Sequence, residues 1–195
     1  MNYEEKQKKL NLDAKEFLNK NLFKKKEEIL TQKIIDFFKN KAQLLIENHE
    51  ILKVINFEFD SIMDFMYSVY PDPYIIPQKY WEDQFIIECD NENDYEVLEN
   101  LRKEFKLEEW DDAYVLIEDE DHYVDIYDIL NELHYSYFEN SWKKAKSVTG
   151  VSYRGFLFWH DSYNGIDLDT GLEARDKDVV KILEKEKFDF TILEG

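Results

Sequence analysis

The first 149 residues of this 195-residue chain contain no glycine, and its three prolines all lie within residues 71–77. Glycine and proline are the residues that most often interrupt helices and strands and that form tight turns. A long stretch with so few of them predicts long regular elements, with the main break at the proline cluster. All five glycines lie at or beyond Gly150, so tight turns are expected mainly after that residue.

The opening of the chain carries a helical pattern. Up to about residue 48, apolar residues such as Ala14 and Leu18 recur every three or four positions, with lysines between them. This spacing is typical of one face of an α-helix. We expect one helix over residues 4–20 and another over 24–48, with a kink near 19–21.

After residue 50 the pattern changes to short strands mixed with helices. Branched and aromatic residues favour strands, and they dominate three segments: 51–59, 84–88 and 113–118. The segment 61–70 fits a strand or a short helix, and we favour the strand. Apolar stripes behind capping residues predict a helix over about 93–106 and another from Asp121 or His122 to Trp142.

The most specific local signal is the pair Asn164-Gly165. An Asn-Gly pair favours the type I′ turn of a β-hairpin, because both central residues of that turn need positive φ. We therefore expect this pair to join two antiparallel strands within residues 153–169. A last helix over 176–186 and a last strand at 188–193 are expected to follow.

Helices and strands are intermixed without a repeating βαβ pattern, and the hairpin requires antiparallel pairing. The sequence therefore predicts an α+β fold with a mostly antiparallel sheet, packed helices and an N-terminal helical arm. Charge supports a division into two parts, because residues 1–53 have a net charge of +3 and residues 54–195 one of −22. We expect a helical arm at residues 1–50 and an acidic α+β domain at 51–195.

The formal charge of the whole chain is −19, and residues 81–139 alone account for −18, with 21 acidic and three basic residues. Such a charge disfavours contact with phosphate backbones, so we expect no direct binding of nucleic acid. The apolar runs are too short for a membrane span or a signal peptide, so no membrane association is expected. A single cysteine, Cys89, excludes an intrachain disulfide and favours the cytoplasm.

Patterns that would indicate a metal site are weak. Residues 118–122 together with Asp125 are rich in carboxylates, which suit Ca²⁺ or Mg²⁺. Consecutive residues point in different directions, however, so a solvated loop before a helix is the favoured interpretation. Residues 167–171 (DLDTG) begin like a calcium-binding EF-hand loop but then depart from it, and we expect a turn there.

Catalytic patterns are weak as well. The four histidines lack a paired spacing, and the chain has no phosphate-binding glycine loop or nucleophile elbow. His134 shares a predicted helix face with Leu130 and Tyr137, so we expect a histidine packed in the core. The interpretation we favour is a protein without catalytic residues, cofactor or metal.

Aromatic residues are interleaved with the acids of residues 81–139. Aromatic rings supply desolvated contact area and carboxylates attract a cationic partner, so this composition suits the recognition of a basic protein. We expect an inhibitor that neutralises such a partner, as an immunity protein against a bacterial toxin or nuclease or as a phage-type inhibitor that mimics nucleic acid. The residues expected to bind the partner are Glu108, Glu109, Trp110, Asp111, Asp112, Glu118, Asp119, Glu120, Asp121, Tyr123 and Asp125.

Two stretches, MNYEEKQKKL at residues 1–10 and DIYDILNEL at 125–133, resemble small bacterial immunity proteins that neutralise nuclease toxins. The resemblance covers less than a third of the chain, and the long second helix and the proline cluster depart from that family. It implies the same class of partner as the charge pattern does.

Two other classes of function stay open. The first is a small enzyme with a dispersed carboxylate and histidine site, which would need His134 or His160 to meet two acids in a deep pocket. The second is a scaffold protein that forms a homo-oligomer through its N-terminal helices. The inhibitor hypothesis itself requires that the carboxylates of residues 81–139 share one surface and are not neutralised by the lysines of the opening helices.

Overall fold

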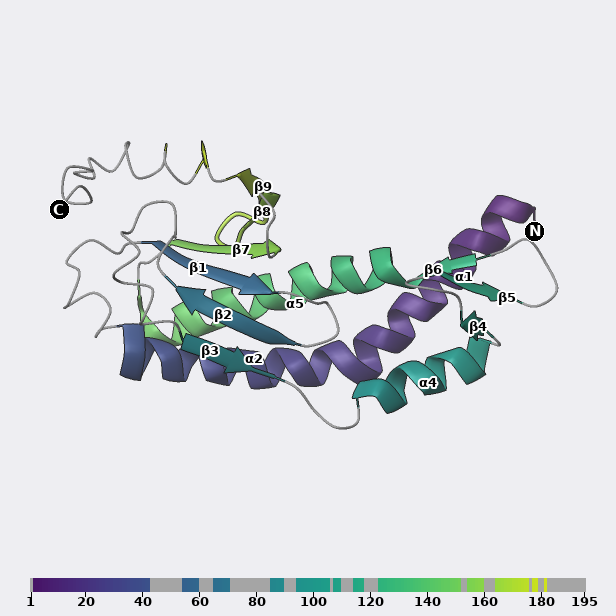
Figure 1. Ribbon diagram of the computed structural model, residues 1–195, viewed down its shortest axis with the longest axis horizontal. Coiled ribbons are helices and arrows are strands. Elements are labelled where there is room, and N and C mark those ends of the chain that lie inside the picture. Colours follow the sequence, from purple (N-terminus) through teal and green to yellow (C-terminus); the bar gives the residue numbers. More distant parts are fainter. Residues whose placement is uncertain are drawn as a thin grey trace. The chain divides into compact units, whose positions relative to one another are not determined.

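The computed structural model describes most of the helices and strands of the chain (Figure 1). The described residues are 2–42, 54–59, 65–70, 85–89, 94–105, 107–109, 114–117, 123–151, 154–159, 164–175, 177, 178 and 181. They form two compact units, unit 1 from Met1–Glu28 with Asp90–Tyr137 and unit 2 from Ile29–Cys89 with Phe138–Gly195. These units are defined by the contacts between residues. The predicted division into residues 1–50 and 51–195 was based on net charge, and it stays a prediction.

The N-terminal helices are present as expected. Helix α1 (Tyr3–Leu18) is followed by a π-helical turn η1 (Asn19–Phe23), helix α2 (Lys24–Phe37) and a second π-helical turn η2 (Phe38–Ala42). A capping box begins α1, in which Glu5 N donates to Asn2 Oδ1 at 2.8 Å and Asn2 N donates to Glu5 Oε2 at 3.0 Å. The remainder of the predicted helix 24–48 lies outside the described residues.

The two π-helical turns follow from a strict four-residue repeat of buried positions. The buried residues of this repeat are Ala14, Leu18, Leu22, Lys26, Leu30, Ile34 and Phe38. On a regular α-helix, a four-residue step drifts around the axis by about 40°, because one turn takes 3.6 residues. A π-helical turn is wider and absorbs part of this drift. The π-helical turn η1 lies at the place where the sequence predicted a kink, near residues 19–21.

Unit 1 combines the start of the chain with helix α4 (Asp94–Phe105), strands β4 (Leu107–Glu109), β5 (Tyr114–Ile117) and β6 (Tyr123–Asp125), and residues 126–137 of helix α5 (Ile126–Thr149). The three strands form an antiparallel sheet in the order β4-β5-β6. Ring contacts join Phe17 of α1 to Phe105 of α4 at 6.2 Å and Phe23 of η1 to Tyr137 of α5 at 5.4 Å, measured between centroids. The predicted helix 93–106 and strand 113–118 are thus confirmed.

The predicted bounds of α5 are wrong at both ends. The helix begins at Ile126 rather than at Asp121 or His122, because residues 123–125 pair with β5 as a strand. It continues past Trp142 to Thr149, since the chain has no helix-breaking residue before Gly150. Gly150 ends the helix with a positive φ of 72°, and its N–H donates to Lys146 O at 2.8 Å.

Unit 2 is built on a six-stranded sheet with the order β3-β2-β1-β7-β8-β9. Its strands are β1 (Val54–Phe59), β2 (Met66–Tyr70), β3 (Phe85–Glu88), β7 (Arg154–Trp159), β8 (Asn164–Asp167) and β9 (Leu172–Arg175). Among the described strands of this sheet, only β1 and β7 pair in parallel, so the sheet is mostly antiparallel as predicted. The strand favoured for residues 61–70 is also confirmed, over Met66–Tyr70.

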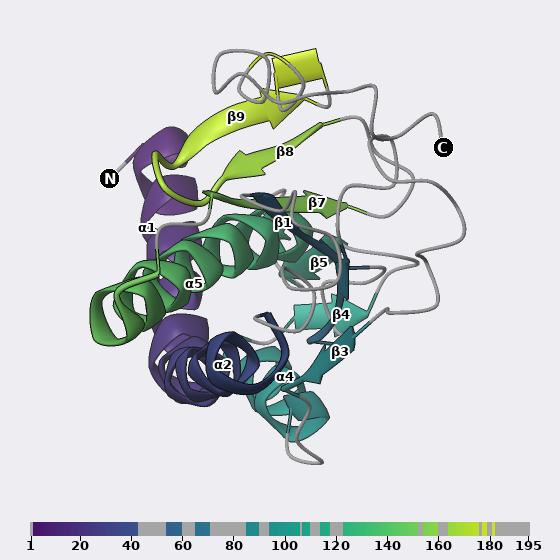
Figure 2. The same ribbon diagram turned by 90° about the vertical axis from the view of Figure 1, so that its left-hand side faces the viewer.

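Aromatic side chains form the core of unit 2. Residues 29–42 and residues 138–149 of α5 lie on the same face of the sheet (Figure 2). The ring of Phe138 lies 4.9 Å from that of Phe57 and 4.7 Å from that of Tyr67, and Trp142 lies 5.6 Å from Phe57 between ring centroids. At Gly155 an added Cβ would come within 2.5 Å of the Trp142 indole, so only glycine fits beneath that ring.

The hairpin of β7 and β8 is confirmed, but its predicted turn is wrong. Asn164 and Gly165 lie in β8 itself, where Gly165 pairs with Phe158 of β7, and the connection is formed by residues 160–163. Glycine is needed at this position for a different reason. A Cβ on Gly165 would come within 2.3 Å of the backbone oxygen of Leu157.

The expected turn at residues 167–171 is present. Gly171 N donates to Asp167 O at 2.7 Å, and strand β9, which the sequence did not predict, follows. Of the predicted helix 176–186, the described residues 177, 178 and 181 are helical. The predicted strand 188–193 lies outside the described residues. Taken together, the elements form the predicted α+β fold with a helical N-terminus.

Among the described helices, none has a stretch of apolar residues long enough to cross a membrane.

Candidate functional site

Unit 1 contains the part of the chain with the most one-sided charge. Residues 107–125, here called the acidic segment, hold nine aspartates and glutamates and no lysine or arginine. Strands β4, β5 and β6 belong to this segment and pair in sequence order. Chain positions that are many residues apart are therefore brought side by side on one small sheet.

Strand register shows which predicted positions the sheet brings together. Glu108 pairs with Leu116, and Leu116 in turn pairs with Tyr123, so these three positions form one row across the sheet. Asp125 pairs with Tyr114, two positions along the same strands. The sheet thus places Glu108 and Tyr123 in one row and Asp125 two rows further along.

Of the eleven residues predicted to bind a partner, Glu108, Glu109, Tyr123 and Asp125 lie in described strands. The other seven lie outside the described residues: Trp110, Asp111, Asp112, Glu118, Asp119, Glu120 and Asp121. The prediction that all eleven share one surface therefore stays a prediction.

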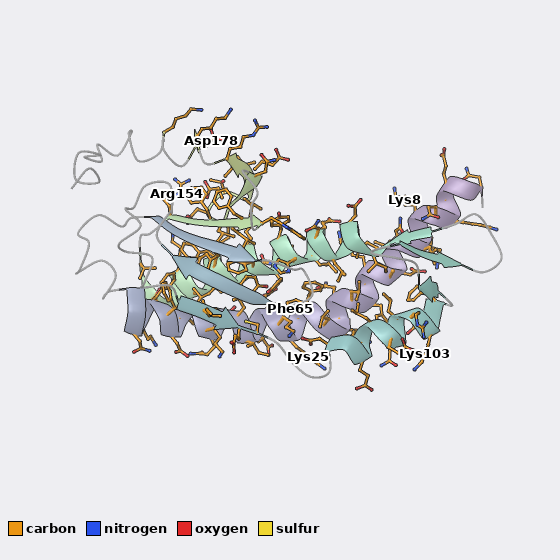
Figure 3. All side chains as sticks on the ribbon, in the orientation of Figure 1. Lys8, Lys25, Phe65, Lys103, Arg154 and Asp178 are labelled. Carbon is orange, nitrogen blue, oxygen red and sulfur yellow. The ribbon has the colours of Figure 1, made fainter. Side chains whose placement is uncertain are left out.

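Charge is distributed unequally between the two units. Residues 1–28 have a net charge of +2 and residues 90–137 one of −14, so unit 1 carries −12 and unit 2 the remaining −7. Some cations of unit 1 are paired within a single helix. On α4, the Arg102 and Lys103 side chains lie 2.9 and 3.5 Å from the Glu99 carboxylate (Lys103 is labelled in Figure 3). The Arg102 guanidinium donates to Glu99 and lowers the pKa of that carboxyl group.

Two lysines of the opening helices pair with acids of residues 81–139. Lys26 Nζ donates to Asp94 Oδ2 at the start of α4, and the two side chains are 2% and 9% exposed. Lys15 Nζ pairs with Glu132 Oε1 on α5. The opening lysines therefore neutralise part of the acidic charge, at two carboxylates that are not among the eleven predicted residues.

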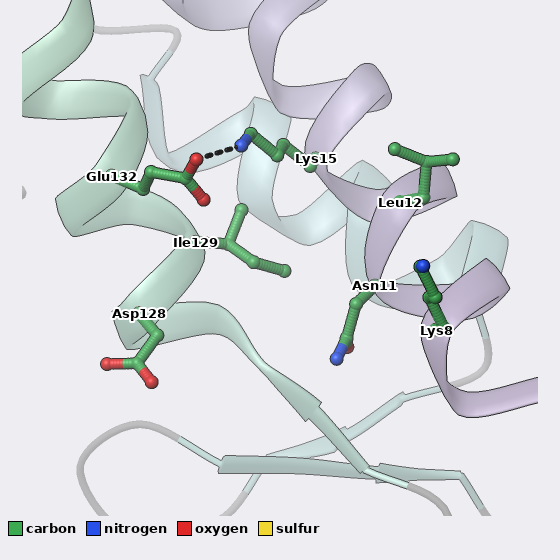
Figure 4. Close-up of a pocket in the computed structure, with 7 residues that line it drawn as sticks. All are labelled: Lys8, Asn11, Leu12, Lys15, Asp128, Ile129 and Glu132. Carbon is green, nitrogen blue, oxygen red and sulfur yellow. Dashed lines mark ion pairs between the residues drawn. The ribbon is translucent and has the colours of Figure 1, made fainter. Parts of the chain in front are cut away.

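A groove with a volume of about 310 Å³ lies between α1 and α5 of unit 1 (Figure 4). Both helices contribute charged and apolar side chains to its lining: Lys8, Asn11, Leu12 and Lys15 from α1, and Asp128, Ile129 and Glu132 from α5. The pair between Lys15 and Glu132 spans the groove (Figure 4). The α5 side of the groove starts close to the acidic segment, since the segment ends at Asp125 and the first groove residue of α5 is Asp128.

His134 is a core residue, as the sequence predicted. It is completely buried in unit 1, and its ring lies edge-on to Tyr137 with 5.3 Å between centroids. Burial lowers the pKa of His134 to about 3, so the imidazole is neutral at physiological pH. His134 does not line the groove, and His160, the other histidine considered for an enzymatic site, lies outside the described residues.

The aspartates of the turn at residues 167–171 are held by cations of unit 2. Asp167 accepts a hydrogen bond from Arg154, and Asp169 accepts hydrogen bonds from Lys146 and from Trp142 Nε1, the last at 3.2 Å. Gly155 N also donates to Asp169, at 3.1 Å. Both carboxylates thus stabilise the structure of unit 2 through these hydrogen bonds. Within the described part of the chain, no group of three or more His, Cys, Asp or Glu side chains is arranged to hold a metal ion.

The sequence did not indicate the groove. The four-residue spacing of Asp128 and Glu132 places them on one face of a helix, and Lys8 and Lys15 are two turns apart on another. The sequence therefore showed which residues share a face on each of the two helices. That α1 packs beside the start of α5, more than a hundred residues later, was not visible in any local pattern.

No protein-family model, curated protein or solved structure matches this chain.

Proposed function

We propose that this protein binds and neutralises a basic protein in the cytoplasm, as an immunity protein does for a bacterial toxin or nuclease. The observation that carries the proposal is the acidic segment, which holds nine aspartates and glutamates and no lysine or arginine in residues 107–125. Three of the nine, Glu108, Glu109 and Asp125, lie on the described strands β4 and β6. A cationic surface that docks there supplies the counter-charge that the segment itself lacks.

Electrostatics supports this use of the segment. Carboxylates concentrated in one short segment repel one another, and this repulsion costs stability unless a cation opposes it. Complementary charge also raises the rate of association with a basic protein and disfavours nucleic acid as a competitor. The row of Glu108, Leu116 and Tyr123 adds apolar and aromatic residues beside the charge, a composition that suits a protein interface.

The proposal is tested by co-expression. Reading frames adjacent to this gene are expressed singly in a bacterial host, each with and without this chain, and growth is measured. We expect one neighbour to encode a basic protein that arrests growth alone and not together with this chain. Absence of growth arrest by any neighbour, or arrest that this chain does not relieve, would reject the immunity function.

Salt dependence tests the mechanism separately from the biological role. The affinity of the purified pair is measured by calorimetry as sodium chloride is raised from about 0.1 M to about 1 M, which shortens the Debye length from about 10 Å to about 3 Å. We expect the affinity to fall steadily over this range. An affinity that does not change with salt would show that binding does not depend on charge.

A further inference from the structure

The groove between α1 and α5 already holds one cation of this chain. Lys15 reaches across it to Glu132, and Ile129 lies beside the pair on the α5 wall (Figure 4). The Lys15 and Glu132 side chains are 33% and 66% exposed. An ion pair this exposed contributes little net stability, because water and salt screen it. A cation from another molecule can therefore replace Lys15 at small cost.

The shape of the acidic wall favours arginine over lysine. Asp128 and Glu132 are four residues apart on α5 and so lie on the same face of the helix, one turn apart. A guanidinium group is planar and has several N–H donors, so it can bind the Glu132 carboxylate through two parallel hydrogen bonds, whereas a lysine ammonium is a single compact charge.

Apolar side chains in the groove suit the stem of such a residue. Leu12 of α1 is 52% exposed, and Ile129 of α5 is almost completely buried. The methylene groups of an arginine can cover apolar surface of this kind while the charged end stays at the carboxylates. Covering Leu12 would also remove one of the few large apolar side chains that the described part of unit 1 exposes.

Asn11 supplies a further acceptor in the same place. Its Oδ1 atom is buried, and no donor among the described residues reaches it. A buried acceptor without a donor costs stability, and a guanidinium entering the groove brings additional N–H groups.

We propose that the groove is the socket for an arginine side chain of the basic partner, which displaces Lys15 from Glu132. This inference rests on the proposed function and adds where and how one cation of the partner is held. The groove adjoins the acidic segment, because Asp128 is only three residues beyond Asp125, so a partner docked on the segment can reach it. Lys15 then acts as a competitor within this chain for the same carboxylate.

The first test uses a defined probe, the acetylated and amidated tripeptide Leu-Arg-Leu. Its binding to the full chain is followed by NMR through the backbone amide signals. We expect shifts at the groove residues of α1 and α5, with about tenfold weaker binding when neutral citrulline replaces arginine and about threefold weaker binding when lysine does. Equal affinity of the arginine and citrulline peptides, or shifts confined to other residues, would overturn the proposal.

The second test separates the groove from net charge. Lys15→Met and Lys9→Met each remove one positive charge from α1, but Lys9 pairs with Asp13 and does not line the groove. We expect Lys15→Met to bind the arginine peptide about threefold more tightly than Lys9→Met does. Equal affinities for the two variants would show that only total charge matters.

Glu132→Gln provides the converse test, with Glu104→Gln on α4 as its control. We expect Glu132→Gln to weaken binding of the arginine peptide at least fivefold and Glu104→Gln less than twofold. Circular dichroism verifies that each variant is folded. Loss of this difference, while the purified partner still binds in a salt-dependent way, would reject the arginine socket and leave the proposed function standing.

Discussion

The ion pair between Lys26 and Asp94 is buried in unit 1 and joins α2 to the start of α4. Replacing Lys26 by methionine keeps most of the side-chain volume and the helix propensity but leaves the Asp94 carboxylate buried without its lysine. Breaking a buried pair in this way typically costs about 3–5 kcal/mol, a large part of a total stability of about 5–15 kcal/mol.

The assay is urea unfolding followed by far-ultraviolet circular dichroism, which reports on the helices of both units. Lys25→Met is the matched control, since Lys25 is the exposed neighbour and carries the same charge. We expect the free energy of unfolding to fall by about 3–5 kcal/mol for Lys26→Met and by no more than about 0.5 kcal/mol for Lys25→Met.

A double variant tests whether the loss comes from the isolated charge. Lys26→Met combined with Asp94→Asn removes both charges, and we expect it to be more stable than Lys26→Met alone by about 2 kcal/mol. If Lys26→Met costs less than about 1 kcal/mol, the pair behaves like a solvated surface pair and the reasoning from burial is refuted.

Three further predictions concern the core. Gly155→Ala places a methyl group against the Trp142 indole, and we expect it to lower the free energy of unfolding by about 1–3 kcal/mol in urea titrations, whereas an unchanged midpoint would contradict the packing described. Asp169→Ala leaves Trp142 Nε1 and Gly155 N without their acceptor and should cost about 1–3 kcal/mol, against no more than about 0.5 kcal/mol for the exposed control Glu173→Ala. Burial lowers the pKa of His134 from 6.5 to about 3. Between these two pH values the unfolded chain therefore binds a proton that the folded chain does not. Because of this proton, the free energy of unfolding falls by at most about 1.4 kcal/mol per pH unit as the solution is acidified. In His134→Gln this contribution is absent, and the stability of the variant should fall less steeply below pH 6.5; equal slopes would show that His134 is not buried in its neutral form.

Local pattern was enough to predict most helices and strands of this fold. The four-residue repeat that begins at Ala14, the alternation of residues 54–59 and the apolar stripe of α4 each depend on neighbouring residues alone. The hairpin of β7 and β8 was found for the same reason. The predicted position of its turn was wrong, because Gly165 is required by the close approach of Leu157 O from the partner strand and not by a turn. A contact between strands of this kind cannot be recognised from the neighbouring residues in the sequence.

The short strands were harder to predict. Strand β6 has only three residues and is defined by its pairing with β5, so Tyr123 and Asp125 were assigned to the start of a helix. The candidate site shows the same limit. The acidic segment was visible as composition, whereas the groove requires α1 to lie beside α5, which no repeat or motif in either segment indicates.

The central claim is that the acidic segment acts as a local docking surface and not merely as part of a large total charge. The triple variant Glu118→Gln, Glu120→Gln, Asp121→Asn removes three charges within the segment. A control triple, Glu88→Gln, Glu173→Gln, Asp36→Asn, removes the same residue types from exposed positions of unit 2. Both are titrated with a basic ribonuclease as a defined cationic probe at about 0.1 M salt. We expect at least tenfold weaker binding for the segment variant and less than a threefold change for the control. Equal losses for the two variants would contradict it.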